Sequence, residues 1–324
     1  MVDLALQDAY WERVAANDAP GARALVEAAL DNGVLLPHVL GGLVGDAQRR
    51  VGDLWAADEW TVAREHAATA VNEQVVHHLR GRSPRPAARD QPLLVVCAER
   101  EWHALPALLL TACLEHEGHA VAYLGADVST TALQTAIADH EPRAALVSAS
   151  LSSSLVFVRR HVEAATASGV PVVVGGAAFD DDGLRARRLG ATAHAGESAA
   201  VAEVLATLPR RVPAVPPLRS EAAREAYALH AAIGAHTDIV TGRVSRSGGA
   251  ATAAVLDQVP HVLGSLAAAL LTDDDGIVAE TRTWLYAVAA ARGCSPETLA
   301  AVWSEIAAQV GDYPCGARML AQAG

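Results

Sequence analysis

The sequence predicts a chain in three parts, with a doubly wound, five-stranded parallel sheet between two all-helical regions. Apolar residues recur three and four positions apart before residue 82 and again after residue 219, as in amphipathic helices. Between residues 92 and 209, short β-branched runs alternate with helical stretches, which is typical of a parallel sheet. Proline-rich stretches at 81–92 and 209–218 separate the parts, because closely spaced prolines stop helices.

The composition indicates a helix-rich protein that does not bind nucleic acid directly. Hydrophobic residues make up 52% of the 324 residues, whereas aromatic residues make up 4%. The net charge is −12, and phosphate neutralisation needs clustered Lys and Arg. The densest basic cluster is Arg185, Arg187 and Arg188, which we expect on one exposed helix face.

Cysteine usage and hydropathy indicate a cytoplasmic protein. The four cysteines form no C-x-x-C pair, so reduced thiols are expected. The first residues lack a basic segment followed by an apolar one, as a secretory signal would have. No uninterrupted apolar stretch is long enough to span a bilayer, so no membrane partner is expected.

The three parts are expected to be separate domains. Residues 1–82 read as a small bundle of about four helices, and residues 92–209 as five strands alternating with five helices. Residues 219–324 read as four or five helices, with breaks near 248–249, 273–276 and 293. Ligands of such sheets bind at the carboxyl ends of the strands. Functional residues are therefore expected after LLVVCA, AALVSAS and PVVVGG.

The loop after the first strand carries the first chemical motif, Glu101-Trp102-His103. It resembles the acid-x-His-x-x-Gly motif of the Rossmann/flavodoxin-like cobalamin-binding domain of methionine synthase, corrinoid methyl carriers and cobalamin photoreceptors. The resemblance implies that His103 is the lower axial ligand of cobalt and that Glu101 hydrogen-bonds its other ring nitrogen. Pro106 replaces the motif glycine, which puts the path of the nucleotide tail in doubt. The alternative is an exposed loop histidine beside an acid.

Two further segments resemble the same domain at the expected strand ends. The third strand ends in Ser148-Ala149-Ser150, similar to a segment whose hydroxyls line the pocket for the displaced nucleotide. The fourth ends in Gly175-Gly176, similar to paired glycines where a missing side chain admits the tail. Together with His103, the resemblance implies that Ser148, Ser150, Gly175 and Gly176 contact the cofactor.

The N-terminal bundle contains Trp55 followed, after nine residues, by Glu65-His66. This spacing resembles the Trp-x9-Glu-His signature of cobalamin photoreceptors, whose bundle caps the adenosyl group of adenosylcobalamin. The resemblance implies that Trp55 packs on the adenosyl group and that Glu65 and His66 contact it. Such photoreceptors often have a histidine where this chain has Ala56, and that histidine can bind cobalt from above after illumination. In this chain His66 or water would have to take that position. The alternative is a core tryptophan and a surface Glu-His pair.

The C-terminal region resembles that of photocobilins, in which a helical domain holds a bilin such as biliverdin near the corrin. The segment that carries this resemblance is TDDDGIVAETRTWLYAVAAARG. Candidate bilin contacts are His230, His236, Asp238 and His261, and for each the alternative is a partly exposed helix residue.

The leading hypothesis is a light sensor that binds adenosylcobalamin and a bilin, and signalling through a subunit interface favours a homo-oligomer. One alternative is a corrinoid methyl carrier of a methyltransferase system, and another is an interaction module that has lost the cofactor, which Pro106 would favour. No G-x-S-x-G elbow, P-loop or zinc spacing occurs, so we expect no enzyme. The downstream partner cannot be read from the sequence.

Overall fold

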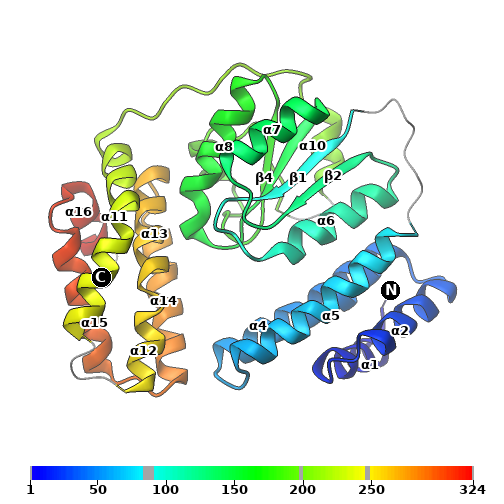
Figure 1. Ribbon diagram of the computed structural model, residues 1–324, viewed down its shortest axis with the longest axis horizontal. Coiled ribbons are helices and arrows are strands. Elements are labelled where there is room, and N and C mark those ends of the chain that lie inside the picture. The colour runs from blue at the N-terminus through cyan, green and yellow to red at the C-terminus, as the bar shows by residue number, and fades with distance from the viewer. Residues whose placement is uncertain (1, 83–90, 197–199, 245–248, 323–324) are drawn as a thin grey trace.

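The computed structural model describes residues 2–82, 91–196, 200–244 and 249–322. Figure 1 shows three bodies: blue N-terminal helices, a central sheet with its helices, and yellow-to-red C-terminal helices. This confirms the predicted fold class, a helical region, a parallel α/β sheet and a second helical region in that order along the chain.

The N-terminal helices form a cap that packs on one helix of the sheet. Its helices are α1 (Leu4–Ala15), α2 (Ala19–Asp31), α3 (Leu36–Val39), the π-helical turn η1 (Leu40–Gly45), α4 (Asp46–Ala56) and α5 (Val62–Arg80). Asp3, Asp18 and Thr61 accept backbone N–H groups at the starts of α1, α2 and α5. Leu105 and Leu108 of the sheet domain are buried in the hydrophobic core of the cap. The cap therefore shares its core with the helix that follows the first strand.

The central domain is a parallel sheet covered on both faces. Its strands are β1 (Leu93–Cys97), β2 (Val121–Gly125), β3 (Ala144–Ser148), β4 (Val172–Gly175) and β5 (Ala193–His194), in the order β2-β1-β3-β4-β5. Its helices are α6 (Ala104–His116), α7 (Thr130–His140), the short η2 (Ser152–Ser154), α8 (Leu155–Ala167), α9 (Leu184–Arg188) and α10 (Val201–Thr207). β1 and β3 are buried at every residue, as expected for strands between two helical layers. This strand order places the topological switch point between β1 and β3.

The C-terminal region contains six helices in the part of the chain that is described, against four or five predicted. They are α11 (Glu221–Val244), α12 (Ala250–Leu256), α13 (Val259–Thr272), α14 (Gly276–Ala291), α15 (Pro296–Val310) and α16 (Pro314–Gln322). The additional breaks precede Pro260 and Pro314, which lie in the first turns of α13 and α16. Proline is accepted there because its missing N–H would be unpaired in any case.

The C-terminal helices share a hydrophobic core with the sheet domain. Leu94 and Leu155 of the sheet domain belong to the same buried cluster as Leu263 and Leu266 of α13. Among the described helices, one stretch, Ala250–Thr272, is long and apolar enough to cross a membrane, but 72% of that window is buried inside the protein. The stretch is therefore explained as the core of the C-terminal domain.

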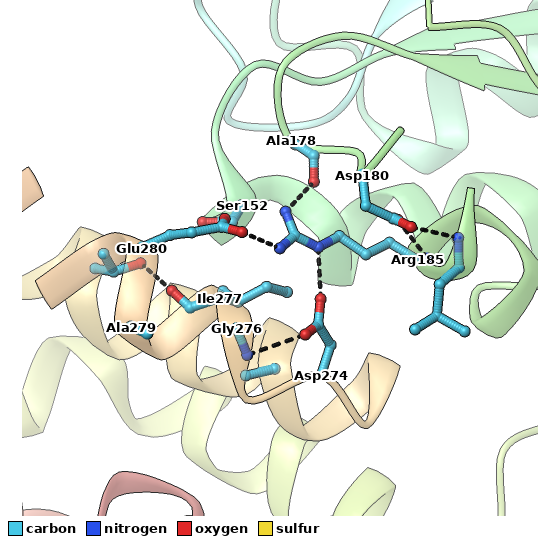
Figure 2. Close-up of polar contacts among 12 residues, drawn as sticks. Ser152, Ala178, Asp180, Arg185, Asp274, Gly276, Ile277, Ala279 and Glu280 are labelled. Carbon is cyan, nitrogen blue, oxygen red and sulfur yellow. Dashed lines mark hydrogen bonds and ion pairs between the residues drawn. The ribbon is translucent and has the colours of Figure 1, made fainter. Parts of the chain in front are cut away.

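Arg185 corrects the expectation that the basic cluster forms an exposed face. Arg185 is 4% exposed, and its Nε and Nη2 atoms lie 2.7 and 2.6 Å from carboxylate oxygens of Asp274 and Glu280. Its Nη1 donates to the carbonyl of Ala178, as Figure 2 shows. The expectation was wrong for Arg185 because its partners lie 89 and 95 residues further along the chain. Arg188, by contrast, is half-exposed.

His161 makes the stability of the fold depend on pH. It lies on α8 with no exposed surface, and burial lowers its pKa to about 4. The unfolded chain binds this proton near pH 6.5, so the contribution of His161 is complete above that pH and falls as the pH drops towards 4. We expect about 2 kcal/mol of the free energy of unfolding to be lost through His161 between pH 7.5 and 5. Urea unfolding of the protein and of His161→Leu at both pH values measures it. An equal pH dependence in the two proteins would contradict this assignment.

Candidate functional site

A buried carboxylate joins the two loops at the switch point of the sheet. Glu101, in the loop after β1, has no exposed surface. One of its oxygens accepts the backbone N–H groups of Ser150 and Leu151, after β3, at 2.7 and 2.9 Å. The other accepts the backbone N–H of His103 at 3.0 Å and lies 2.6 Å from Nδ1 of the same residue. Glu101 therefore fixes both loops and the orientation of the His103 ring.

This arrangement sets the protonation of the pair. Burial alone would raise the pKa of Glu101, but hydrogen bonds from His103 and Leu151 hold that pKa below its usual value. The hydrogen bond to Glu101 raises the pKa of His103. With Nδ1–H donated to the carboxylate, Nε2 is the free ring nitrogen, and the side chain is 54% exposed. Metal-binding histidines are held in this way by a carboxylate on the nitrogen opposite the metal.

A cavity of about 110 Å³ lies at the carboxyl ends of β3 and β4, next to α6. Ser148, Gly175 and Gly176, which the resemblance assigns to contacts with the cofactor, line it, and so does Pro106. Pro106 lies in the first turn of α6, where its missing N–H breaks no helical hydrogen bond. The cavity thus exists with Pro106 in its wall. Ser150 is not part of this cavity wall, and its backbone N–H donates to Glu101, so the expected contact of its hydroxyl with the cofactor stays a prediction.

The paired glycines are required by the backbone that surrounds the cavity. A Cβ atom on Gly175 would lie 2.5 Å from the carbonyl oxygen of Ala195, and one on Gly176 would lie 2.4 Å from that of Ala149. Gly176 also has a φ of +107°, which side chains strongly disfavour. These positions therefore accept no larger residue, and the cavity beside them stays open.

The cap places its candidate residues on helices α4 and α5. The hydrogen bond to Glu101 is the largest cause of the raised pKa of His103, and the negative charge of Glu65, on α5, adds to it. Glu65 accepts the hydroxyl of Thr69 at 2.9 Å. His66 is 73% exposed, with its Nε2 3.3 Å from Glu65. Trp55 is partly buried in the last turn of α4.

Comparison with known proteins identifies the first two parts of the chain. A B12-binding domain model matches residues 92–206, and a second B12-binding domain model matches residues 6–80. The chain is a cobalamin-binding protein. The predicted cobalamin-binding domain and helical cap are thus confirmed as B12-binding domains. The site residues and the photoreceptor character stay predictions. The C-terminal helices lie outside both matches.

Three solved structures are similar to this chain, and one of them, with a TM-score above 0.5, shares the fold of its first two parts. The monomethylamine corrinoid protein of Methanosarcina barkeri is 21% identical, with a TM-score of 0.51 over 63% of this chain and 98% of that one. A cobalamin-binding protein from Desulfitobacterium hafniense DCB-2 is 17% identical, with a TM-score of 0.33 over 61% and 96% of the two chains. The methanol:cobalamin methyltransferase complex of M. barkeri is 14% identical, with a TM-score of 0.34 over 66% and 83%. No curated protein sequence matches the chain.

The residues at the switch point suit a corrinoid. Among the described residues there is no group of three His, Cys, Asp or Glu side chains that could bind a metal ion by themselves. A corrin would itself supply most of the ligands of its cobalt, so one nitrogen from the protein would be sufficient. The exposed ring of His103 would supply that nitrogen, and the cavity lined by Ser148, Gly175 and Gly176 lies at the carboxyl ends of the neighbouring strands β3 and β4.

The C-terminal domain of the cobalamin-binding chain reaches the cap at Trp55. The ring of Trp284, on α14, stacks on Trp55 with centroids 6.5 Å apart and planes at 23°. The guanidinium of Arg292 lies 4.9 Å from the centroid of Trp55. It also donates to the carbonyl oxygens of Trp55 and Ala56, at 3.1 and 3.3 Å. No local sequence pattern indicates these contacts, because 236 and 237 residues separate the bonded pairs.

Of the C-terminal candidates, His261 lies next to the switch-point loops. Its Nδ1 is 2.9 Å from the hydroxyl of Ser153, and its ring meets Trp284 edge-on at 5.2 Å. Burial lowers the pKa of His261 to about 4, and the charges of Glu101 and His103 also act on it.

The other C-terminal candidates lie elsewhere in the domain. His230 packs edge-on against Phe157. His236 lies within hydrogen-bond distance of Gln309 and Tyr313, and Asp238 is exposed. These contacts suit structural roles for His230 and His236. Trp102, which precedes His103, was not singled out from the sequence, and it is 71% exposed beside the candidate cobalt ligand.

Proposed function

We propose that this chain is a light sensor that holds adenosylcobalamin between the sheet and the cap. The observation that supports the proposal most strongly is the contact of Trp284 and Arg292 with Trp55, because it ties the cap to a domain outside the B12-binding matches. The chain has no catalytic role in this proposal and acts through changes in packing.

Each candidate residue has a defined part in holding the cofactor. His103 would bind cobalt through Nε2, with Glu101 as the acceptor that keeps Nδ1 protonated. The cavity lined by Ser148, Gly175 and Gly176 would take the nucleotide tail. Trp55 would supply a flat apolar wall, and Glu65 would accept hydroxyl groups of a ribose. Adenosylcobalamin itself supplies a cobalt–carbon bond that light breaks.

The contact between the C-terminal domain and the cap favours a sensor over a carrier. A methyl carrier must present the upper face of its corrin to a separate enzyme, so its cap has to move aside in each cycle. Here Arg292 and Trp284 engage the end of α4 from the C-terminal domain. Such a contact suits a cap that stays closed until one event releases it. We propose that the C-terminal domain also holds a bilin such as biliverdin beside the corrin, where His261 and Trp284 lie near the switch-point loops.

A corrinoid methyl carrier is the second candidate, and the comparisons favour it. The similar structure with a TM-score of 0.51 is named a monomethylamine corrinoid protein, and 98% of its length is covered. A carrier would need the cap and the sheet but would leave the C-terminal domain without a stated role.

Reconstitution in the dark separates the two candidates. The full chain is titrated with adenosylcobalamin and methylcobalamin, each with and without biliverdin, and absorption is recorded before and after green light. A sensor is expected to bind the adenosyl form at least about tenfold more tightly, a difference of about 1.4 kcal/mol. It should also change its hydrogen exchange in α4 and α5, or its oligomeric state, after illumination.

Free adenosylcobalamin is the control, because its own photolysis changes the spectrum without protein. Equal affinity for the two cobalamins, with no change in the protein after illumination, would contradict the sensor and support the carrier. Retention of a red-absorbing band after gel filtration would support the bilin.

A further inference from the structure

The geometry points to Arg292 and Trp284 as positioning residues that hold Trp55 in place and so determine which upper ligand the cobalamin site prefers. This inference rests on the proposed function, because it concerns the adenosyl side of the same site. It assigns a role to the C-terminal domain that requires no second pigment.

Arg292 fixes the backbone at the end of α4. The last carbonyl groups of a helix lack partners within the helix, and a cation near them is favourable. Arg292 donates to two of them, those of Trp55 and Ala56. The carbonyl of Trp55 also accepts the N–H of Asp58, whose φ of 60° turns the chain out of the helix. The backbone that carries the Trp55 side chain is thus held from within the cap and from the C-terminal domain.

The indole of Trp55 is held as well as its backbone. The Arg292 guanidinium lies 4.9 Å from the centroid of the Trp55 ring. The ring of Trp284 stacks on the same indole, with centroids 6.5 Å apart. The Arg292 side chain is 11% exposed, and its Nε is 3.8 Å from Asp58. An arginine that is this enclosed and makes several directed contacts has few other positions open to it. Its partner indole is correspondingly restricted.

The contact connects two bodies that have separate cores. The buried cluster of the cap contains α6 residues such as Leu105, whereas the C-terminal helices belong to the cluster of the sheet. Removal of the Arg292 contact therefore leaves both cores intact. The ring of Trp284 also meets that of His261 edge-on, and His261 is hydrogen-bonded to Ser153 in η2, after β3. Trp55 is in this way positioned relative to the loops that carry His103 and Glu101.

The test compares adenosylcobalamin with methylcobalamin in the full chain. Dissociation constants are measured in the dark for the parent protein, Arg292→Ala and Trp284→Leu. The ratio of the methylcobalamin dissociation constant to the adenosylcobalamin dissociation constant is expected to fall about tenfold in Arg292→Ala. The affinity for methylcobalamin is expected to change by less than about twofold. Arg292→Lys keeps the charge but not the planar group, so it is expected to restore part of the preference.

Arg243→Ala is the matched control. Arg243 pairs with Glu305 at 2.8 Å, within the C-terminal domain, and its side chain is 57% exposed. This variant is expected to keep the parent ratio. Thermal unfolding of each variant reports whether the fold is retained.

Each remaining outcome has a definite meaning. A parent protein that prefers the adenosyl form, with the same preference in Arg292→Ala and Trp284→Leu, would overturn the positioning role and leave the light sensor standing. An equal loss of affinity for both cobalamins would also overturn it, because it indicates a general structural role. A parent protein without any preference would overturn this inference, and it would overturn the proposed function as well if illumination also left the protein unchanged.

Discussion

Replacement of His103 by alanine is expected to weaken cobalamin binding by about 10- to 100-fold and to remove the nitrogen ligand below cobalt. Glu101 already holds the ring through Nδ1, so the parent protein offers Nε2 without reorganisation. Alanine removes that nitrogen, while Glu101 keeps its hydrogen bonds to Ser150 and Leu151. The loops after β1 and β3 should therefore stay joined, and the loss should concern the cofactor rather than the fold.

Electron paramagnetic resonance of the cobalt(II) form measures the ligand directly, because an axial nitrogen splits the cobalt signal. Titration followed by absorption gives the affinity. His140→Ala is the control, since His140 is exposed at the end of α7. Nitrogen splitting that persists in His103→Ala would show that another group binds cobalt.

The arrangement of the sheet could be predicted because its signals are local. Parallel strands buried on both faces read as continuous apolar runs, and all five appear where the sequence placed them. Because the strands are parallel, the carboxyl ends of β1, β3 and β4 lie at the same edge of the sheet. His103, Ser148 and Gly176 were therefore expected there. The pattern did not indicate that Glu101 joins the loops after β1 and β3, because this contact is made by the backbone N–H of Ser150, which every residue except proline has.

The contacts of the C-terminal domain could not be predicted, because no local pattern encodes them. In the sequence Arg292 looks like any solvent-exposed arginine near the end of a helix. Its partners, Trp55 and Ala56, lie 237 and 236 residues earlier in the chain. Arg185 was assigned to an exposed face because a short helix with three arginines usually has one. The partners that bury it arrive from a different domain. A single sequence describes a helix face well and its distant partner poorly.

Replacement of Arg185 by alanine is expected to lower the free energy of unfolding by about 3 kcal/mol. Arg185 is 4% exposed and bonded to Asp274 and Glu280. Its removal leaves the carboxylate of Asp274, which is 17% exposed, without its cation, and the carbonyl of Ala178 without its donor. Glu280 is 62% exposed and regains water, so it adds little to the loss.

Urea unfolding of the full chain, followed by circular dichroism, measures this loss, with Arg188→Ala as the control. The side chain of Arg188 is 50% exposed and lies 3.4 Å from Asp273, so its removal is expected to cost less than about 1 kcal/mol. Equal stability of the two variants would contradict the buried role of Arg185. Because the Ala178 carbonyl follows the paired glycines of the cavity, Arg185→Ala should also loosen that loop. Faster hydrogen exchange at residues 176–180 would then accompany the loss of stability, whereas Arg188→Ala should leave exchange there unchanged.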